Sequence, residues 1–118
     1  CLKVCSCCDS ILVEMDEREY FQYPAFWVRV RVRYLKDRGH FLWFVVQLEI
    51  FWNDVWTPIS RYDTSHGFVH RDDLQPNGEQ IKTLPMLFPN YEDALNFAIR
   101  DFRLNYEFYT ERYKKWIR

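Results

Sequence analysis

The sequence predicts an α+β domain in which an antiparallel β-meander of three to four strands packs on one long C-terminal helix. Apolar and polar residues alternate from residue 26 to 52, polar turns separate the apolar runs, and the apolar spacing changes to three and four residues after residue 90. Alternation is typical of half-buried strands, and the wider spacing is typical of an amphipathic helix. We expect residues 25–118 to form this single domain and residues 1–24 to form an N-terminal tail or a short extra element.

The first two predicted strands form a hairpin. In FWVRVRVRYL, residues 26–35, three valines and a tyrosine share one face and three arginines share the other. HFLWFVVQLEIFW, residues 40–52, follows a turn in which Gly39 can take a positive φ. Its apolar face comprises Leu42, Phe44, Val46, Leu48 and Ile50. Antiparallel pairing would place Gln47 and Glu49 opposite the arginines.

The remaining elements follow in order along the chain. After a turn at Asn53 and Asp54, VWTPISRYD predicts a third strand in which Pro58 indicates a sheet edge or a bulge. IKTLP, residues 81–85, predicts a short fourth strand. Asn90 is a good N-cap for a helix from about 91 to 117, which would be about 40 Å long. This helix is longer than the sheet needs, so its last turns are expected to overhang or to dock on a partner.

Composition limits the class of protein. The 118 residues are 48% hydrophobic and 19% aromatic, which fits one folded domain. A net charge of −1 gives the whole molecule no attraction for nucleic acid. No apolar run approaches the roughly 18 residues of a membrane span, so we expect a cytoplasmic protein. The four cysteines are Cys1, Cys5, Cys7 and Cys8; they lack a second separated pair, so we expect a reduced tail and no zinc site.

The segment RYDTSHGFVHRDD, residues 61–73, concentrates titratable side chains. Histidine transfers protons near neutral pH, and arginine binds phosphate through parallel hydrogen bonds. Metal-independent RNA cleavage needs both, together with a carboxylate that orients the base. The candidate catalytic residues are therefore His66 and His70 as acid and base, Arg61 and Arg71 as phosphate ligands, and Asp63 as the orienting group.

The same segment has two other interpretations. Asp63, His66, His70 and Asp72 are also suitable ligands for a divalent ion. In an extended strand, however, residues 66 and 70 lie roughly 13 Å apart, and only a tight turn at Gly67 would bring them together. We therefore assign no metal ligands and no cofactor.

The structural interpretation is a polar turn. Asp63, Thr64 and Ser65 have the chemistry of an Asx-turn, and Gly67 allows a positive φ. Histidines in such a turn can bond backbone carbonyls without any catalytic role.

A nucleic-acid surface is predicted on the arginine face of the sheet. Arg29, Arg31 and Arg33 could follow a phosphate backbone, while Trp43 or Trp27 stacks on a base. The alternative is a solvated strand face whose arginines pair with Glu49.

The motif RYDTSHGFVHRD resembles a family of small uncharacterised bacterial proteins with the pattern RYDT-x-HG-x-x-H-x-D. The resemblance runs from about Trp56 to Tyr113 and includes the helix ALNFAIRDFRLNYEFYTERY. More distantly, the chain is similar to TumE-type toxins of toxin–antitoxin systems, which pair a short β-meander with an R-Y-D segment, histidines and a C-terminal helix. This similarity implies an RNA or translation target and a partner antitoxin.

These observations support two functional hypotheses. The first is a small toxin-like protein that acts on RNA as a ribonuclease, with an antitoxin or another protein as its partner. The second is a non-enzymatic module, or a subunit of a larger assembly, that docks through the arginine-rich sheet face and the long helix. The sequence does not indicate an oligomeric state.

Overall fold

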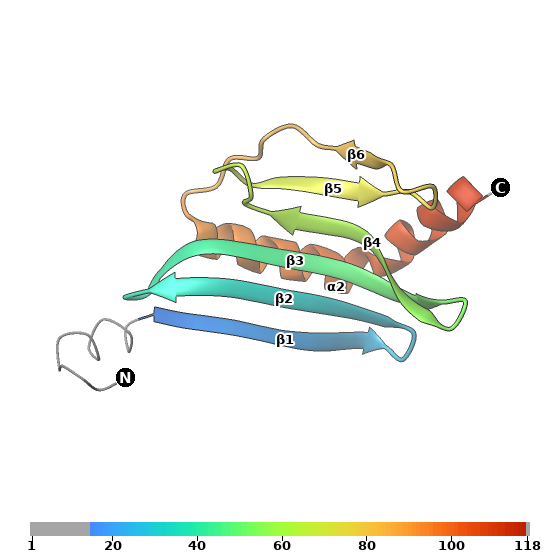
Figure 1. The fold of residues 1–118 in the computed structure, drawn as a ribbon, viewed down its shortest axis with the longest axis horizontal. Helices are drawn as coiled ribbons and strands as arrows, with labels where there is room; N and C mark the ends of the chain where they lie inside the picture. Colours follow the sequence, from blue (N-terminus) through green and yellow to red (C-terminus); the bar gives the residue numbers. More distant parts are fainter. Residues whose placement is uncertain (1–14, 118) are drawn as a thin grey trace.

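A computed structural model describes residues 15–117 and shows a six-stranded antiparallel sheet with one long helix (Figure 1). The strands follow one another in the sheet in chain order, and every neighbouring pair is antiparallel. The elements are β1 (Met15–Ala25), β2 (Val28–Asp37), β3 (His40–Trp52), β4 (Val55–Asp63), β5 (His70–Leu74), β6 (Gln80–Lys82) and α2 (Tyr91–Ile117). The α+β class and the C-terminal helix are confirmed, but the sheet is larger than three to four strands. The predictions made for the four cysteines lie outside the described residues.

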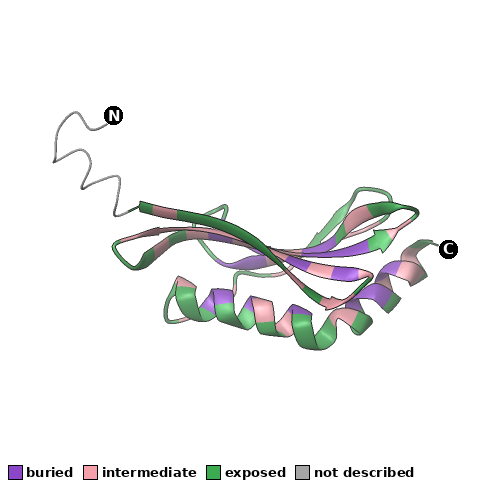
Figure 2. Cartoon of the chain, turned by 90° about the horizontal axis from the view of Figure 1, so that it is seen from below, coloured by how far each residue is buried: buried purple, intermediate pink, exposed green. Residues whose placement is uncertain are grey.

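The domain has two layers. Helix α2 runs along one face of the twisted sheet, the buried apolar residues lie between the two, and no described element covers the other face, called the open face below (Figure 2). Alternation along β2 and β3 places the predicted apolar faces against the helix. The buried core comprises Val28, Val30, Val32, Phe44, Val46, Leu48, Ile50, Ile59, Tyr62, Val69, Ala94, Leu95, Ala98, Phe102, Tyr109 and Tyr113.

The hairpin turns form where the sequence predicts them. Arg38 and Gly39 have φ values of 53° and 82°, and Asn53 and Asp54 have values of 51° and 66°. Two successive positive φ angles match the right-handed twist of the flanking strands. In the β2–β3 register, Arg29 pairs with Glu49 and Arg31 with Gln47, as predicted.

Two bulges change which side chains reach the core. The β3–β4 register shifts beside Pro58, which confirms the bulge predicted there. The β2–β3 register also shifts, between Leu35 and Lys36, and this shift was not predicted. As a result, Phe41 packs against Tyr34 at a ring distance of 5.0 Å, while Leu42 is 47% exposed. The prediction that Leu42 belongs to the core is wrong because an extra residue in the strand reverses the alternation.

Strand β1 is formed almost entirely by residues that we expected to form a tail or a short extra element. It pairs with β2 along the length of both strands, so the sheet begins at Met15 rather than at residue 25. Its sequence, MDEREYFQYPA, shows no clear alternation because most of its side chains are exposed at the sheet edge. Its acidic residues instead face the arginines of β2: Glu19 lies 2.6 Å from Arg31, and Glu17 lies 4.0 Å from Arg33.

Helix α2 begins as predicted and bends halfway. Asn90 Oδ1 accepts a hydrogen bond from the Asp93 amide at 2.8 Å, which confirms the N-cap. The backbone leaves helical geometry at Asn105, with φ −119° and ψ 17°. Beyond this kink, Tyr109 and Tyr113 are buried and Trp116 packs against the core. The last turns therefore lie on the domain instead of overhanging it.

Candidate functional site

The β4–β5 hairpin divides the polar segment between the two faces of the sheet. Arg61 pairs with Asp72, and Asp63 pairs with His70, on the open face. The intervening pairs, Tyr62 with Arg71 and Ser60 with Asp73, face the helix because neighbouring side chains alternate. The prediction that Arg71 joins the histidines in one site is therefore wrong.

A buried cluster of ionisable side chains lies on the open face. His70 is 3% exposed, and its Nε2 atom lies 3.0 Å from Asp63 Oδ1 and 3.5 Å from Asp72 Oδ2. Asp63 thus contacts the imidazole that we expected it to orient. Arg61 lies at the border of the cluster, with its Nε atom 3.3 Å from Asp63 Oδ2 and an Nη atom 3.8 Å from Asp72 Oδ2.

A tight turn holds this cluster in place. Gly67 has a φ of 83°, and its amide donates to the Thr64 carbonyl at 3.0 Å. Asp63 Oδ1 accepts hydrogen bonds from the Ser65 amide at 3.2 Å and the Ser65 hydroxyl at 3.0 Å, which confirms the predicted Asx-turn. The turn stacks the His66 and His70 rings with centroids 5.7 Å apart. The tight turn at Gly67 therefore forms, and the separation of roughly 13 Å in an extended strand does not apply here.

The two histidines differ in their access to solvent. His66 is exposed, whereas His70 is buried and its Nδ1 atom lies 3.5 Å from the Phe68 carbonyl oxygen. Only His66 is therefore placed to touch a molecule that approaches from solvent.

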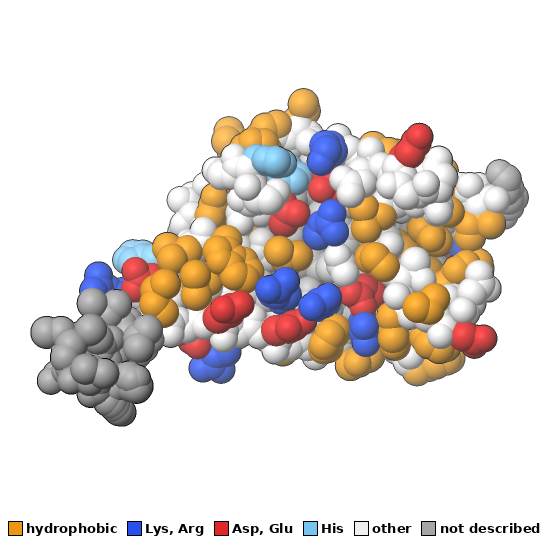
Figure 3. Space-filling model, in the orientation of Figure 1, with side chains coloured by type: hydrophobic (Ala, Val, Ile, Leu, Met, Phe, Trp, Pro, Cys, Tyr) orange, Lys and Arg blue, Asp and Glu red, His pale blue; other side chains and the backbone are white. Residues whose placement is uncertain are grey.

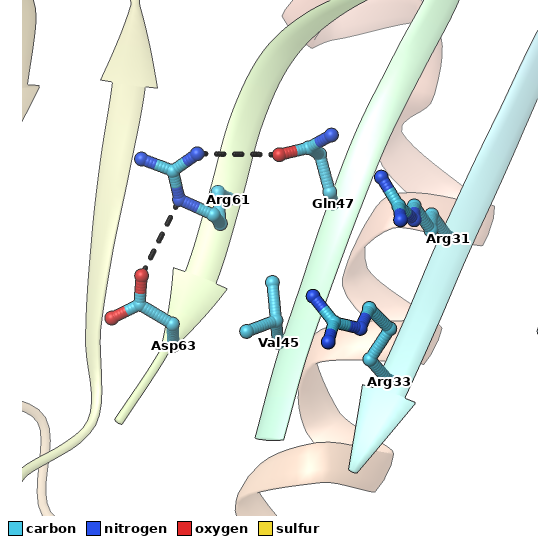
Figure 4. Close-up of a pocket in the computed structure, with 6 residues that line it drawn as sticks. All are labelled: Arg31, Arg33, Val45, Gln47, Arg61 and Asp63. Carbon is cyan, nitrogen blue, oxygen red and sulfur yellow. Dashed lines mark hydrogen bonds and ion pairs between the residues drawn. The ribbon is translucent and has the colours of Figure 1, made fainter. Parts of the chain in front are cut away.

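A pocket of about 280 Å³ adjoins the cluster (Figure 4). Its lining comprises Arg31, Arg33, Val45, Gln47, Arg61 and Asp63. Three arginines from β2 and β4 line it, and Arg61 also donates to Gln47 Oε1 at 3.2 Å. Figure 3 shows this open face, where basic and acidic side chains alternate in a band across the sheet.

The residues predicted to bind nucleic acid have different surroundings. Arg29 donates to Glu49 at 2.7 Å, and its guanidinium lies 4.4 Å from the Phe21 ring and 4.3 Å from the Trp56 ring. Arg29 is thus held within the sheet face, as the alternative interpretation predicts. Arg31 and Arg33 line the pocket, and the Trp43 ring lies 5.6 Å from the Arg33 guanidinium.

Sequence reasoning missed a second polar network on the helix side of the sheet. Asp73 is 2% exposed and accepts hydrogen bonds from Arg71 at 3.1 and 3.2 Å and from Ser60 at 2.8 Å. Arg112 of the helix lies 2.9 Å from the same carboxylate. If β5 had been identified as a strand, alternation along β4 and β5 would have placed Ser60, Tyr62, Arg71 and Asp73 on one face.

Two tyrosines extend this network to Asp101 of the helix. Tyr62 donates to Asp101 Oδ2 at 2.7 Å, and Tyr109 donates to the same oxygen. Burial, with help from the hydrogen bond to Asp101, raises the pKa of Tyr62 to about 12. Burial and Asp101 likewise raise the pKa of Tyr109. Both hydroxyls therefore remain neutral donors throughout the physiological pH range.

These pKa shifts predict alkaline destabilisation. An unfolded tyrosine ionises near pH 10, so the stability that Tyr62 contributes is complete below about pH 10 and is lost as the pH rises through about 12. We expect the free energy of unfolding, measured by urea denaturation, to fall across this window. The free energy of unfolding of Tyr62→Phe should fall less steeply with pH, because this variant lacks the ionising hydroxyl. Equal slopes in the two proteins would contradict the assignment to Tyr62.

Comparison with known proteins gives the family of the chain. No curated protein and no solved structure matches it significantly. No helix within residues 15–117 is both long and apolar enough to cross a membrane. A family model described as a domain of unknown function, DUF7718, matches residues 15–118. The match begins where β1 begins and spans every described element, so the chain belongs to the DUF7718 family.

Proposed function

We propose that this protein acts on RNA and that its arginine-lined pocket binds a phosphodiester group. One observation carries the proposal: Arg31, Arg33 and Arg61 line a single pocket that Asp63 of the histidine cluster also lines. Guanidinium groups bind phosphate oxygens through paired hydrogen bonds, and the Gln47 amide adds a neutral polar group. Because basic and acidic side chains alternate on the rest of this face, we expect phosphate groups to be attracted to the pocket and not to the whole face.

His66 supplies the proton-transfer group in this proposal. It is exposed on the turn that follows Asp63, and its ring stacks on His70. His70 acts as a positioning residue, because its buried ring contacts the Asp63 carboxylate and stacks against the His66 ring. A general acid or base of this kind contributes about 10²- to 10⁴-fold to a rate.

The toxin assignment extends this proposal. The distant similarity to TumE-type toxins, in the R-Y-D segment, the histidines after it and the order of the elements, supports an RNA target and a partner antitoxin. Cleavage at the pocket would make the isolated protein harmful to the cell that produces it, and an antitoxin would then act by covering the open face.

RNA binding tests the proposal directly. We expect the wild type to bind a fluorescent single-stranded RNA in anisotropy titrations with EDTA present. Arg33→Gln should weaken binding and reduce the salt dependence by about one charge. Arg33 suits this test because its side chain is 40% exposed and its nearest carboxylate, on Glu17, lies 4.0 Å away.

Arg18→Gln is the matched control. Arg18 is an exposed arginine on β1 whose register partner is Tyr34, on the face opposite the pocket. It should leave RNA affinity unchanged. Equal losses in the two variants would indicate a general charge effect, and no binding by the wild type would reject the proposal.

A further inference from the structure

We propose that Asp63, His70 and Asp72 bind one divalent transition-metal ion, of the class of Mn²⁺ or Zn²⁺. Each residue offers one ligand atom, and the three atoms lie within 4.8 Å of one another. One imidazole nitrogen with two carboxylate oxygens is a ligand set that first-row divalent ions accept. The proposal goes beyond the RNA function and does not depend on it.

The distances between the donor atoms fit a shared ion. His70 Nε2 lies 3.0 Å from Asp63 Oδ1 and 3.5 Å from Asp72 Oδ2. Two ligands that are each about 2.1 Å from one ion, at tetrahedral or octahedral angles, lie roughly 3.0–3.4 Å apart. The two distances from His70 Nε2 are thus close to the spacing of ligands, and the carboxylate oxygens, which lie within 4.8 Å of one another, need at most a small side-chain adjustment.

The surroundings of His70 orient its ring for coordination. Nδ1 faces the Phe68 carbonyl oxygen at 3.5 Å, outside the cluster. With its proton on Nδ1, the ring directs the Nε2 lone pair toward the two carboxylates. A backbone carbonyl in this position is the usual outer partner of a metal-bound histidine. A proton on Nε2 that donates to Asp63 is the competing arrangement, and ion binding distinguishes the two.

Asp63 Oδ1 accepts two hydrogen bonds from Ser65, whereas one oxygen of Asp72 lacks such a partner within residues 15–117. Asp63 and Asp72 are 7% and 3% exposed. Asp72 Oδ1 is buried and has no hydrogen-bond partner among the described residues; the ammonium of Lys82 lies 3.5 Å away, but that side chain is 59% exposed. Arg61 approaches the two carboxylates only at 3.3 and 3.8 Å. Because buried carboxylates need close partners, a divalent ion would stabilise this arrangement.

The experiment measures Mn²⁺ binding to the full chain without RNA. Electron paramagnetic resonance counts the free ion, and thiolates have little affinity for Mn²⁺, so the four cysteines do not compete. We expect one ion per chain and at least about tenfold weaker binding by Asp72→Asn. Asp16→Asn, an exposed carboxylate on β1, should bind as the wild type does. No binding, or equal binding by Asp72→Asn, would overturn the proposal.

A second measurement needs no variant and remains informative if Asp72→Asn fails to fold. Bound Mn²⁺ broadens the NMR signals of nearby nuclei in the wild-type protein. The His70 and His66 rings should broaden first, because they lie within or beside the cluster, while His40 at the β2–β3 turn stays sharp. Broadening of His40 to the same extent would place the ion elsewhere or show that it binds nonspecifically. Failure of RNA binding in EDTA would leave this result unaffected.

Discussion

Replacing Asp73 with alanine is expected to lower the free energy of unfolding by about 3–5 kcal/mol. The carboxylate is 2% exposed and receives hydrogen bonds from two Arg71 nitrogens and the Ser60 hydroxyl, with Arg112 at 2.9 Å. Its removal leaves Arg71 without a carboxylate partner in the space between sheet and helix. Breaking one side of a buried ion pair costs more than the pair itself contributes, because the remaining charge stays poorly solvated.

Urea denaturation followed by circular dichroism measures this effect. Asp16→Ala is the matched control because Asp16 forms an exposed pair with Arg18 at 2.7 Å, and such pairs contribute about 1 kcal/mol or less. If Asp73→Ala lowers the free energy of unfolding by less than about 1 kcal/mol, the contacts of Asp73 with Arg71, Ser60 and Arg112 contribute little to stability. Arg112→Met should give a smaller loss, since the Arg112 side chain is 29% exposed and methionine keeps an apolar chain in place of the arginine stem.

This network shows where sequence reasoning stopped. Strands β2 and β3 were predictable because one face of each is apolar, so alternation reports burial directly. The five residues of β5, HRDDL, bury their polar side chains by pairing them, on one face with Arg61 and Asp63 and on the other with Ser60 and Arg112. Such a strand has no hydrophobic alternation, and its partners are known only once the register is known.

The candidate site was predictable in residue type but not in arrangement. Asp63, His66 and His70 do come together, because Gly67 allows the turn that the spacing alone left open. Arg71 adjoins His70 in the chain and nevertheless faces the helix, since strand alternation separates neighbours. Arg31 and Arg33 reach the site from β2 through long-range pairing of β2, β3 and β4, which no local pattern reports.

The open face combines an anionic and a cationic part at short range. The buried carboxylates of Asp63 and Asp72 lie next to the guanidinium of Arg61, and the pocket beyond contains Arg31 and Arg33. An RNA strand with one phosphodiester in that pocket would pass beside the turn that carries His66. A bound divalent ion would remove the repulsion between the phosphate and the two carboxylates. The two proposals are therefore compatible, although each is tested separately.

Replacing His66 with alanine is expected to reduce RNA cleavage by about 10²- to 10⁴-fold, the usual contribution of a general acid or base. His66 is exposed; its ring stacks on His70 at a centroid distance of 5.7 Å and lies tilted against Phe68 at 6.2 Å. The variant should therefore keep the thermal midpoint of the wild type. His70→Ala should instead lower that midpoint, because its ring is 3% exposed and contacts two buried carboxylates.

Cleavage of an end-labelled RNA by purified protein measures the effect, with His40→Ala as the control for an exposed histidine far along the sheet. His40→Ala should cleave as the wild type does. If His66 transfers the proton, His66→Ala should lower the cleavage rate at saturating RNA. The RNA affinity measured by anisotropy should stay nearly unchanged, because the arginines that bind phosphate are intact. Folded His66→Ala with wild-type cleavage would remove this residue from the chemistry. A wild type that binds RNA without cleaving it would restrict the protein to binding, with the turn at Gly67 serving only to shape the pocket.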